Sequence, residues 1–479
     1  MACQRVPNRA TGFVNGRSRL CARPVRTDSG RSACTYYLNN ASATSGEENL
    51  SKRLSKKWLP LAATIALGVG LVACGDDSDS SSEDTTAAAE ATADTTAPAD
   101  TTATADTTAA TETTAAAASA GDWSANFKPW EEGAAPVACG PKDGGPLKAA
   151  WVYVGPINDG GWTQTHDEAR MKVQEHFGDK VETTYKENVP EGEQVSQVVE
   201  DLIADGNTVI FGTSFGFQDA FLAAAEKHPD VCFEFATGYK SAGNLSQFYG
   251  AAEDTDYLAG MAAGAASKTG KLGYLGSFGI PEVVRGINAW TLGARAMNPD
   301  ATVKIVWVNS WFDPPTERKQ AEALIAAGVD VLGMKGIDSP ATGDAAKAAG
   351  IPWAGYNRDN SANYADVWLT GTQYHWDVYQ IPRLQQVLDG TWTAGNYYGN
   401  IGDGFVSLST YGDLVSEETR AKIEEKKAEL AANPGGEFTG PIVDTAGKEQ
   451  LAAGKQHTYE ELMGMQYLVE GVDGEIPAG

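Results

Sequence analysis

Histidine is scarce in this sequence, and the catalytic motifs that depend on it are missing. Five histidines occur in 479 residues. The nearest two, His166 and His176, are too far apart to share one face of a helix. The chain has neither a His-Glu-x-x-His motif nor a Walker phosphate-binding loop. Asp167 is a poor acid/base partner for His166, because adjacent helix residues point in different directions. We therefore expect no enzymatic activity, no metal site and no cofactor.

Positive charge is also in short supply, and it is unevenly placed. The chain has 63 Asp and Glu against 37 Lys and Arg, a net charge of -26. The segment before Cys74 carries 11 Lys/Arg and 3 Asp/Glu, so the remainder has a net charge of -34. Such a polyanion repels phosphate backbones and anionic lipid, which excludes nucleic acid as a partner. Attachment to a membrane would have to come from an acyl chain.

A short apolar run, Trp58 to Gly70, follows a basic cluster at Lys52 to Lys57. The run is too short to span a bilayer comfortably. It ends in Leu71-Val-Ala-Cys74, where a small residue precedes a cysteine, as at the cleavage site of bacterial lipoproteins. We expect residues 50–73 to be a lipoprotein signal peptide. Cys74 would then be lipidated, anchoring the chain to the extracytoplasmic face of the cell membrane.

The segment ahead of this signal, residues 1–49, has several arginines, no hydrophobic pattern and three cysteines, Cys3, Cys21 and Cys34. It fits poorly in front of a signal peptide. We interpret it as a non-native leader, with translation starting near Leu50 or Leu54. The alternative is a disordered cytoplasmic leader.

Residues 74–122 combine the proposed lipidated cysteine with a low-complexity linker. Asp-Thr-Thr-Ala recurs along it, and residues 75–120 contain 10 acidic residues, no basic ones and no aromatic ones. Such a composition cannot bury enough apolar surface to fold, and its charges repel one another. We expect an extended spacer that holds the following domain away from the membrane.

Only two cysteines, Cys139 and Cys232, lie beyond the linker. An even number in an oxidising compartment suits a disulfide bond. Two buried free thiols are the alternative, since sequence does not show proximity.

Strand-like and helix-like segments alternate from about Trp123 onward, over a length that suits two lobes. Leu147 to Val154 is the first buried strand of one series, and Lys271 begins a second. Two such series predict an α/β fold with two doubly wound parallel sheets. Ligands in such folds bind beyond the carboxyl ends of the strands, here in a cleft between the lobes.

The loops at these strand ends supply aromatic and carboxylate side chains. Facing aromatic planes with one or two carboxylates suit a flat heteroaromatic ligand that has N–H donors. The alternatives are a helix-capping role for Asp159, a core role for Trp162, and a core position for Phe215 or Phe217. The candidate ligand-binding residues are Tyr153, Asp159, Trp162, Phe215, Phe217, Tyr239, Trp311, Asp338, Asn357 and Asp359.

Several of these loops together resemble the basic membrane protein family, the purine-binding solute receptors of ABC importers. The resemblance covers about Pro146 to Leu408 and rests on VGPINDGGWTQTHDEAR, GTSFGFQDA, FGIPEVVRGINAWTLGARAMNP, VNSWFDPPTERKQAEALIAAGVDV and IDSPA. It implies a type I periplasmic-binding-protein fold with a hinge, and ABC permease subunits as partners. Residues 123–479 would be bilobed. Lobe 1 would span about 145–254 and 372–392, and lobe 2 about 271–370 and 400–479.

Departures from the family pattern bear on the ligand. Tyr153 stands where nucleoside-binding members usually have Asp, Thr237 replaces another Asp, and residues 369–377 lack a lysine. The resemblance is instead to the branch that takes a free purine base such as adenine. It implies that Trp162 stacks on the ring opposite Phe215, Phe217 or Trp311, and that Asp159 or Asp338 accepts hydrogen bonds from it. A receptor for a sugar or another small polar solute, an enzyme, and a surface lipoprotein without a transport role are the alternatives.

Overall fold

The structure is a computed structural model, and it describes residues 123–477. The predicted leader, the predicted signal peptide, the predicted lipidation site at Cys74 and the predicted linker lie outside the described residues. Among the helices of the described range, none combines the length and the apolar character needed to cross a bilayer.

The first lobe is a seven-stranded sheet in the order β1-β12-β6-β5-β4-β2-β3. All neighbouring strands are parallel except β1 and β12. Every residue of β2 except Lys148 is buried, as expected for a strand covered on both faces. The strands are β1 (Phe127–Pro129), β2 (Leu147–Val152), β3 (Val181–Lys186), β4 (Val209–Gly212), β5 (Cys232–Ala236), β6 (Leu245–Gly250) and β12 (Gly395–Gly399). The helices are α1 (Trp162–Phe177), α2 (Glu193–Ala204), α3 (Gln218–Lys227) and α8 (Asp377–Leu388).

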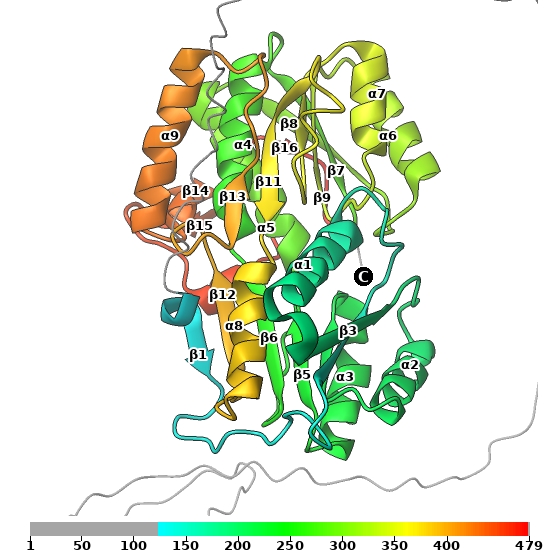
Figure 1. Cartoon of the computed structure of the whole chain (residues 1–479). Helices are drawn as coiled ribbons and strands as arrows, with labels where there is room; N and C mark the ends of the chain where they lie inside the picture. Colours follow the sequence, from blue (N-terminus) through cyan, green and yellow to red (C-terminus); the bar gives the residue numbers. More distant parts are fainter. Residues whose placement is uncertain (1–122, 478–479) are drawn as a thin grey trace, which may run out of the picture. The chain divides into compact units, whose positions relative to one another are not determined.

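The second lobe is another seven-stranded sheet, in the order β13-β11-β10-β9-β7-β8-β16 (Figure 1). Only the β11–β13 pair is antiparallel. Its strands are β7 (Lys271–Gly276), β8 (Thr302–Trp307), β9 (Val331–Lys335), β10 (Trp353–Gly355), β11 (Trp368–Tyr374), β13 (Val406–Leu408) and β16 (Val472–Asp473). Its helices are α4 (Ala252–Ala266), α5 (Pro281–Met297), α6 (Pro314–Ala326), α7 (Ala341–Ala349) and α9 (Glu417–Ala432). The two parallel α/β sheets confirm the expected fold class.

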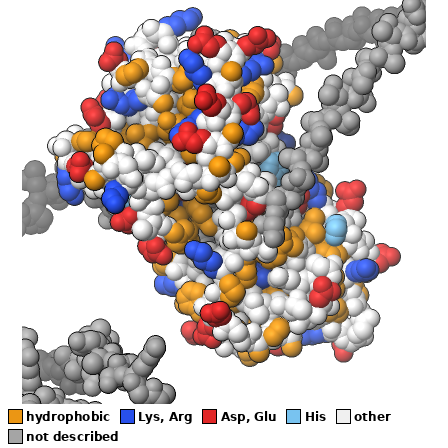
Figure 2. Space-filling model, turned by 90° about the vertical axis from the view of Figure 1, so that its left-hand side faces the viewer, with side chains coloured by type: hydrophobic (Ala, Val, Ile, Leu, Met, Phe, Trp, Pro, Cys, Tyr) orange, Lys and Arg blue, Asp and Glu red, His pale blue; other side chains and the backbone are white. Residues whose placement is uncertain are grey.

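The chain crosses between the two sheets three times. It leaves the first sheet after β6, returns to it after β11, and leaves it again after β12. Figure 2 shows hydrophobic side chains gathered at the waist between the lobes, with charged side chains spread over both. The structure therefore has the multiply crossed connection that the family resemblance implied.

The lobe boundaries differ from those expected at each crossing. Helix α4 packs on β10 and β11, so the first crossing falls at residues 250–252 rather than at about 254. Strand β11 stays in the second sheet through Tyr374, because its antiparallel pairing with β13 extends that far. The first lobe also gains β1 and β12, which lie outside the ranges 145–254 and 372–392.

A C-terminal segment follows α9 and packs near the waist. It contains the hairpin of β14 (Ile442–Val443) and β15 (Glu449–Leu451), and the short helix α10 (Tyr459–Met463). The Arg285 side chain of α5 donates to the carbonyl of Leu462 at 3.1 Å, and Asn288 donates to Tyr467 O at 2.7 Å. These bonds attach the segment to the second lobe beside the cleft.

Cys139 and Cys232 form a disulfide bond, with their Cα atoms 5.7 Å apart. The bond joins the segment before β2 to the first residue of β5 across 93 positions of the sequence. The disulfide alternative is therefore the one that the structure supports.

Replacing both cysteines with serine should lower the free energy of unfolding by about 2–4 kcal/mol, because the unfolded chain regains the freedom that a long closed loop removes. Urea unfolding of the variant and of the wild type measures the difference. The reduced wild type is the matched control and should lose a similar amount. Equal stability with and without reductant would contradict a stabilising role for the bond.

Candidate functional site

A pocket lies between the two lobes, at the carboxyl ends of their parallel strands. Its free interior is narrow, about 20 Å³, and the space grows to about 320 Å³ when the solvent at its open mouth is included. Its lining residues follow β2, β4 and β5 in the first lobe and β7, β8, β9 and β10 in the second. This is the position at which doubly wound sheets bind ligands. The lining residues are Val154, Trp162, Thr213, Ser214, Phe215, Thr237, Glu282, Trp311, Gly336, Asp338 and Tyr356.

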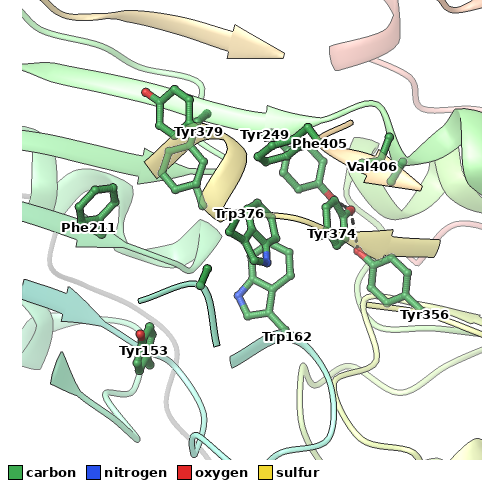
Figure 3. Close-up of a cluster of buried hydrophobic side chains, with 14 of the residues drawn as sticks. Tyr153, Trp162, Phe211, Tyr249, Tyr356, Tyr374, Trp376, Tyr379, Phe405 and Val406 are labelled. Carbon is green, nitrogen blue, oxygen red and sulfur yellow. Dashed lines mark hydrogen bonds between the residues drawn. The ribbon is translucent and has the colours of Figure 1, made fainter. Parts of the chain in front are cut away.

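Trp162 is held in a fixed orientation. It is the first residue of α1, and its indole N–H donates to the carbonyl of Thr213 at 2.7 Å. Its ring packs edge-on against Trp376 at 5.0 Å and against His166 at 4.7 Å (Figure 3). These T-shaped ring contacts and the hydrogen bond at the indole nitrogen fix the plane of the Trp162 ring without a ligand. The side chain is thus preorganised for stacking.

Trp311 and Phe215 supply aromatic surface from opposite lobes. Trp311 follows β8 of the second lobe, and its indole N–H donates to the Glu191 carboxylate of the first lobe at 3.2 Å. The same carboxylate accepts hydrogen bonds from the Ser214 hydroxyl at 2.6 Å and from the Gly216 N–H at 2.8 Å. Glu191 therefore connects the two aromatic loops when the lobes are together.

Two carboxyl groups of the second lobe line the pocket, Asp338, which is buried, and Glu282, which is half-buried. Burial raises the pKa of Asp338 well above its ordinary range, and the neighbouring charges of Asp159 and Glu317 raise that pKa further. Burial also raises the pKa of Glu282, while a hydrogen bond from the Tyr249 hydroxyl, 2.6 Å long, lowers it. The pocket thus contains carboxyl groups with a strong need for hydrogen-bond donors.

A chain of phenol hydroxyls runs from Glu282 across the waist. Tyr249 of β6 contacts Tyr374 of β11, with their oxygens 2.7 Å apart, and Tyr374 contacts Tyr356 at 3.1 Å (Figure 3). The Lys335 ammonium lies 4.4 Å from the centre of the Tyr356 ring, and it donates to Asp256 at 2.6 Å. Because β6 and β11 belong to different sheets, the chain links the two lobes at the back of the pocket.

Four of the predicted ligand-binding residues line this pocket, namely Trp162, Phe215, Trp311 and Asp338. A fifth, Tyr239, lies in an adjoining chamber, 61% exposed, with its ring stacked on Phe215 at 5.6 Å. The structure therefore brings together four of the predicted aromatic side chains and only one of the predicted carboxylates, Asp338.

The carboxylate of Asp159 turns toward its own helix. It accepts hydrogen bonds from the backbone N–H groups of Gly161, Thr163 and Gln164 at 2.8–3.0 Å. This is the capping role that the sequence left open. Since three donors already occupy its oxygens, we leave Asp159 out of the proposed ligand contacts.

Gly160 and Gly161 approach the opposite lobe, where the sequence suggested close approach of a ligand. A Cβ atom on Gly161 would lie 2.3 Å from the carbonyl oxygen of Asp338, and one on Gly160 would lie 2.8 Å from Pro340. The glycines therefore allow the loop after β2 to touch the loop after β9.

The remaining predicted residues occupy structural positions. Tyr153 is buried, and its hydroxyl lies 3.3 Å from Asp167, away from the cluster around Trp162 in Figure 3. Phe217 is fully buried and stacks on Phe221 in the core of the first lobe, as the sequence allowed for one of the two phenylalanines.

Asn357 and Asp359, which follow β10, also lie outside the pocket lining. Asn357 is fully buried beside Gly161 and has a positive φ of 73°. Asp359 accepts hydrogen bonds from the N–H groups of Ser361 and Thr410 at 2.8 and 2.9 Å. Both residues shape the second-lobe loops.

Sequence reasoning missed seven of the lining residues, and the two with ionisable side chains are Glu282 and Tyr356. Glu282 lies in the first turn of α5, directly after Pro281, where an acidic residue normally only complements the helix dipole. Tyr356 is next to Asn357 in the same strand-end loop. Both residues follow parallel strands, β7 and β10, and this position could have identified them as candidates.

The loop after β4 matches the Gly-x-Ser-x-Gly pattern of serine hydrolases, in Gly212-Thr-Ser-Phe-Gly216. Its Ser214 hydroxyl donates to Glu191. In the part of the chain that the structure describes, no histidine is hydrogen-bonded to Ser214, so the serine lacks the base that would activate it. Within residues 123–477 there is likewise no group of three or more His, Cys, Asp or Glu that could hold a metal ion.

Comparisons with known proteins agree with this geometry. The family model described as "ABC transporter substrate-binding protein PnrA-like" matches residues 147–435. The chain is 42% identical over 337 residues to a purine-binding protein of Brucella abortus, covering 69% of this chain and 94% of that protein. It is 38% identical over 340 residues to a putative ABC transporter glucose-binding protein of Haloferax volcanii, covering 71% of this chain and 83% of the relative.

A solved structure of an ABC transporter solute-binding protein from Aeropyrum pernix shares the fold. It superposes with a TM-score of 0.55 at 15% identity, covering 66% of this chain and 97% of that one. At this identity the likeness shows the fold alone.

Replacing Asp338 with Asn should stabilise the ligand-free protein. It should also make the melting temperature depend less on pH. The pKa of Asp338 is raised on folding, so its stabilising contribution is complete below about pH 4 and is lost as the pH rises. Asn does not titrate, and at pH 7.5 the variant should melt roughly 2–4 °C higher than the wild type. Melting curves from pH 4 to 8 measure this. The conservative Asp359→Asn variant, at a site whose pKa is lowered, should show no such gain. A parallel pH profile for Asp338→Asn and wild type would contradict the argument.

Proposed function

Because the chain belongs to the PnrA-like family of ABC transporter substrate-binding proteins, we propose that the solute it binds is a purine base, with adenine favoured. The family consists of solute-binding proteins rather than enzymes. The proposal concerns the identity of the ligand and the way in which the cleft holds it.

The observation that carries the proposal is a fixed tryptophan plane in a pocket that also contains one buried carboxyl group, Asp338, and one half-buried carboxyl group, Glu282. Trp162 is oriented before any ligand arrives, and Phe215 and Trp311 offer aromatic surface from the two lobes. Stacking of a base on an aromatic ring contributes about 1–3 kcal/mol. A flat ligand would have to separate these surfaces in order to enter, because the free space between them is about 20 Å³.

Asp338 and Glu282 supply the acceptors for the edge of the base. Adenine presents an exocyclic amine and a ring N–H, and each can donate to one carboxyl group. Burial makes both groups costly without partners, so donors on the ligand are worth more here than at an exposed site. Specificity for an amine-bearing ring follows from this arrangement.

The printed names of two relatives support competing ligands. The Brucella relative is called purine-binding, and the Haloferax relative is called a putative glucose-binding protein. A sugar would use aromatic faces and carboxylates too. A direct comparison of purines with sugars therefore decides between them.

We expect isothermal titration calorimetry to show that adenine binds more tightly than adenosine, ribose or glucose. Trp162→Ala should weaken adenine binding about ten- to hundredfold, because the stacking surface is lost. Trp162→Phe should keep most of the affinity, since a ring remains. Trp307→Ala, at the end of β8 and outside the pocket lining, is the matched control and should bind normally. Tighter binding of glucose than of adenine would overturn the ligand assignment.

We further propose that the protein works at the extracytoplasmic face of the membrane, held there by a lipid on Cys74, and delivers its ligand to ABC permease subunits. Closure of the lobes on the ligand would present one rigid surface to the permease.

Cys74→Ser should release the protein from the membrane fraction, because the proposed acyl acceptor is gone and the acidic body does not bind anionic lipid. Fractionation of cells that produce each form measures the shift. Ser78→Ala, four residues after the proposed lipidation site, is the control and should stay in the membrane fraction with the wild type. A Cys74→Ser protein that remains fully membrane-bound would contradict the anchor.

A further inference from the structure

A second, larger chamber adjoins the pocket on the C-terminal side of the waist. Its free interior is about 590 Å³, and it shares Phe215, Thr237 and Glu282 with the first pocket. The two spaces therefore adjoin at these three residues. A ligand held in the pocket could extend past them into the chamber.

One wall of the chamber comes from outside the residues that the family model matches. Tyr459, Met463 and Gly464, on and after α10, lie beyond residue 435, where that match ends. The wall is attached to both lobes. Arg285 of α5 donates to the carbonyl of Leu462, and the Asn396 amide of β12 donates to the Tyr459 hydroxyl at 2.9 Å. The chamber is thus a built feature of this chain.

The chamber presents mainly rings and apolar groups. Two of its tyrosine hydroxyls are already used, since Tyr249 donates to Glu282 and Tyr398 donates to Glu253 at 2.5 Å. What these tyrosines offer a ligand is therefore the ring. The rest of the aromatic and apolar lining consists of Trp130, Phe215, Tyr239, Phe248, Tyr459, Ile280, Pro281 and Met463. Such a surface suits an aromatic or aliphatic group.

Glu282 lies at the junction of the two spaces, and this position limits how a ligand could bridge them. An exocyclic amine that donates to Glu282 would sit at the junction. If that amine carries a substituent, it still retains one N–H for the carboxylate. The substituent then replaces the second hydrogen and points away from the ring.

We propose that the chamber receives an apolar or aromatic substituent on the exocyclic nitrogen of a bound purine, so that the full ligand is an N6-substituted adenine. This inference rests on the proposed function of the first pocket. It adds a ligand class and a recognition site formed in part by α10.

Titration calorimetry on the full chain tests the proposal with adenine, N6-benzyladenine and 9-benzyladenine as probes. N6-benzyladenine should bind at least about ten times more tightly than adenine, because its benzyl ring is buried in the chamber. The 9-benzyl isomer should bind more weakly than adenine. N6-benzyladenine affinity equal to or below that of adenine would overturn the chamber assignment.

Filling the chamber from either side provides an independent test. Met463→Trp acts from α10 and Ser241→Trp from the first-lobe loop after β5, and both residues line the chamber alone. Each variant should remove the advantage of N6-benzyladenine while adenine affinity stays within about twofold of wild type. Met171→Trp, at an exposed position of α1, is the matched control and should change neither affinity. If both filled variants lost affinity for adenine and for N6-benzyladenine by the same factor, the proposal would be overturned.

Adenine binding in the first pocket and substituent binding in the chamber are tested separately. A wild-type protein that binds no adenine would contradict the proposed function. A wild-type protein that binds adenine and excludes N6-benzyladenine would leave that function intact and contradict the chamber assignment alone.

Discussion

A buried glutamate holds together the part of the fold on which the site depends. Glu234 of β5 is fully buried and accepts hydrogen bonds from Arg383 at 2.8 Å, from the Tyr379 hydroxyl at 2.6 Å and from the Trp392 indole at 2.6 Å. These three donors all lie on the segment that returns to the first lobe after β11. Arg383 also donates to Ser246 of β6. A buried charge is tolerable only with such complete pairing, so the returning segment has one favourable place. Its position sets β12, and β12 sets the last crossing between the lobes.

The lobes meet through small residues and through polar contacts that cross the cleft. Gly161 fits against the backbone of Asp338 with no room for a Cβ atom. Arg358 of the second lobe pairs with Glu168 of α1 at 3.1 Å, and Trp311 donates to Glu191. These two crossing contacts are partly exposed, so each contributes modestly. The Tyr249–Tyr374 hydroxyl contact between the sheets is buried and is the better shielded link.

The sequence predicted regular elements well where hydrophobic periodicity was strong. Helix α5 spans Pro281–Met297 as expected, because Pro281 marks its start and its apolar face is regular. Strand β6 and helix α4 were not predicted. Nearly every residue of α4 is buried, including three of its acidic residues, so it shows no polar face and no helical period. Strand β12, Gly395–Gly399, reads as a turn because it begins and ends with glycine.

The sequence predicted which loops form the site, but it did not predict which side chains of those loops line the pocket. Asp159 and Asp338 both follow buried strands and precede helices, so their sequences look alike. Three free backbone donors at the start of α1 turn Asp159 inward, while Asp338 faces the pocket. In the sequence, Glu282 resembles an ordinary acidic residue in the first turn of a helix. In the fold, β7 and β6 place it at the waist between the lobes. Which of two similar acids reaches a ligand is decided by tertiary packing, which a single sequence does not show.

Glu282 also shows how binding and closure can be one event. It belongs to α5 of the second lobe, yet its carboxylate is held by Tyr249 of the first lobe, which in turn contacts Tyr374 on β11. The acceptor for a ligand amine is thus oriented by a contact that exists only when the lobes are together. A donor on the ligand strengthens that arrangement and gains affinity from it. Since the same carboxylate borders both spaces of the cleft, this coupling acts on whatever group occupies the junction. In the proposed binding mode, the geometry of the waist would therefore select the ligand through its amine as well as through its ring.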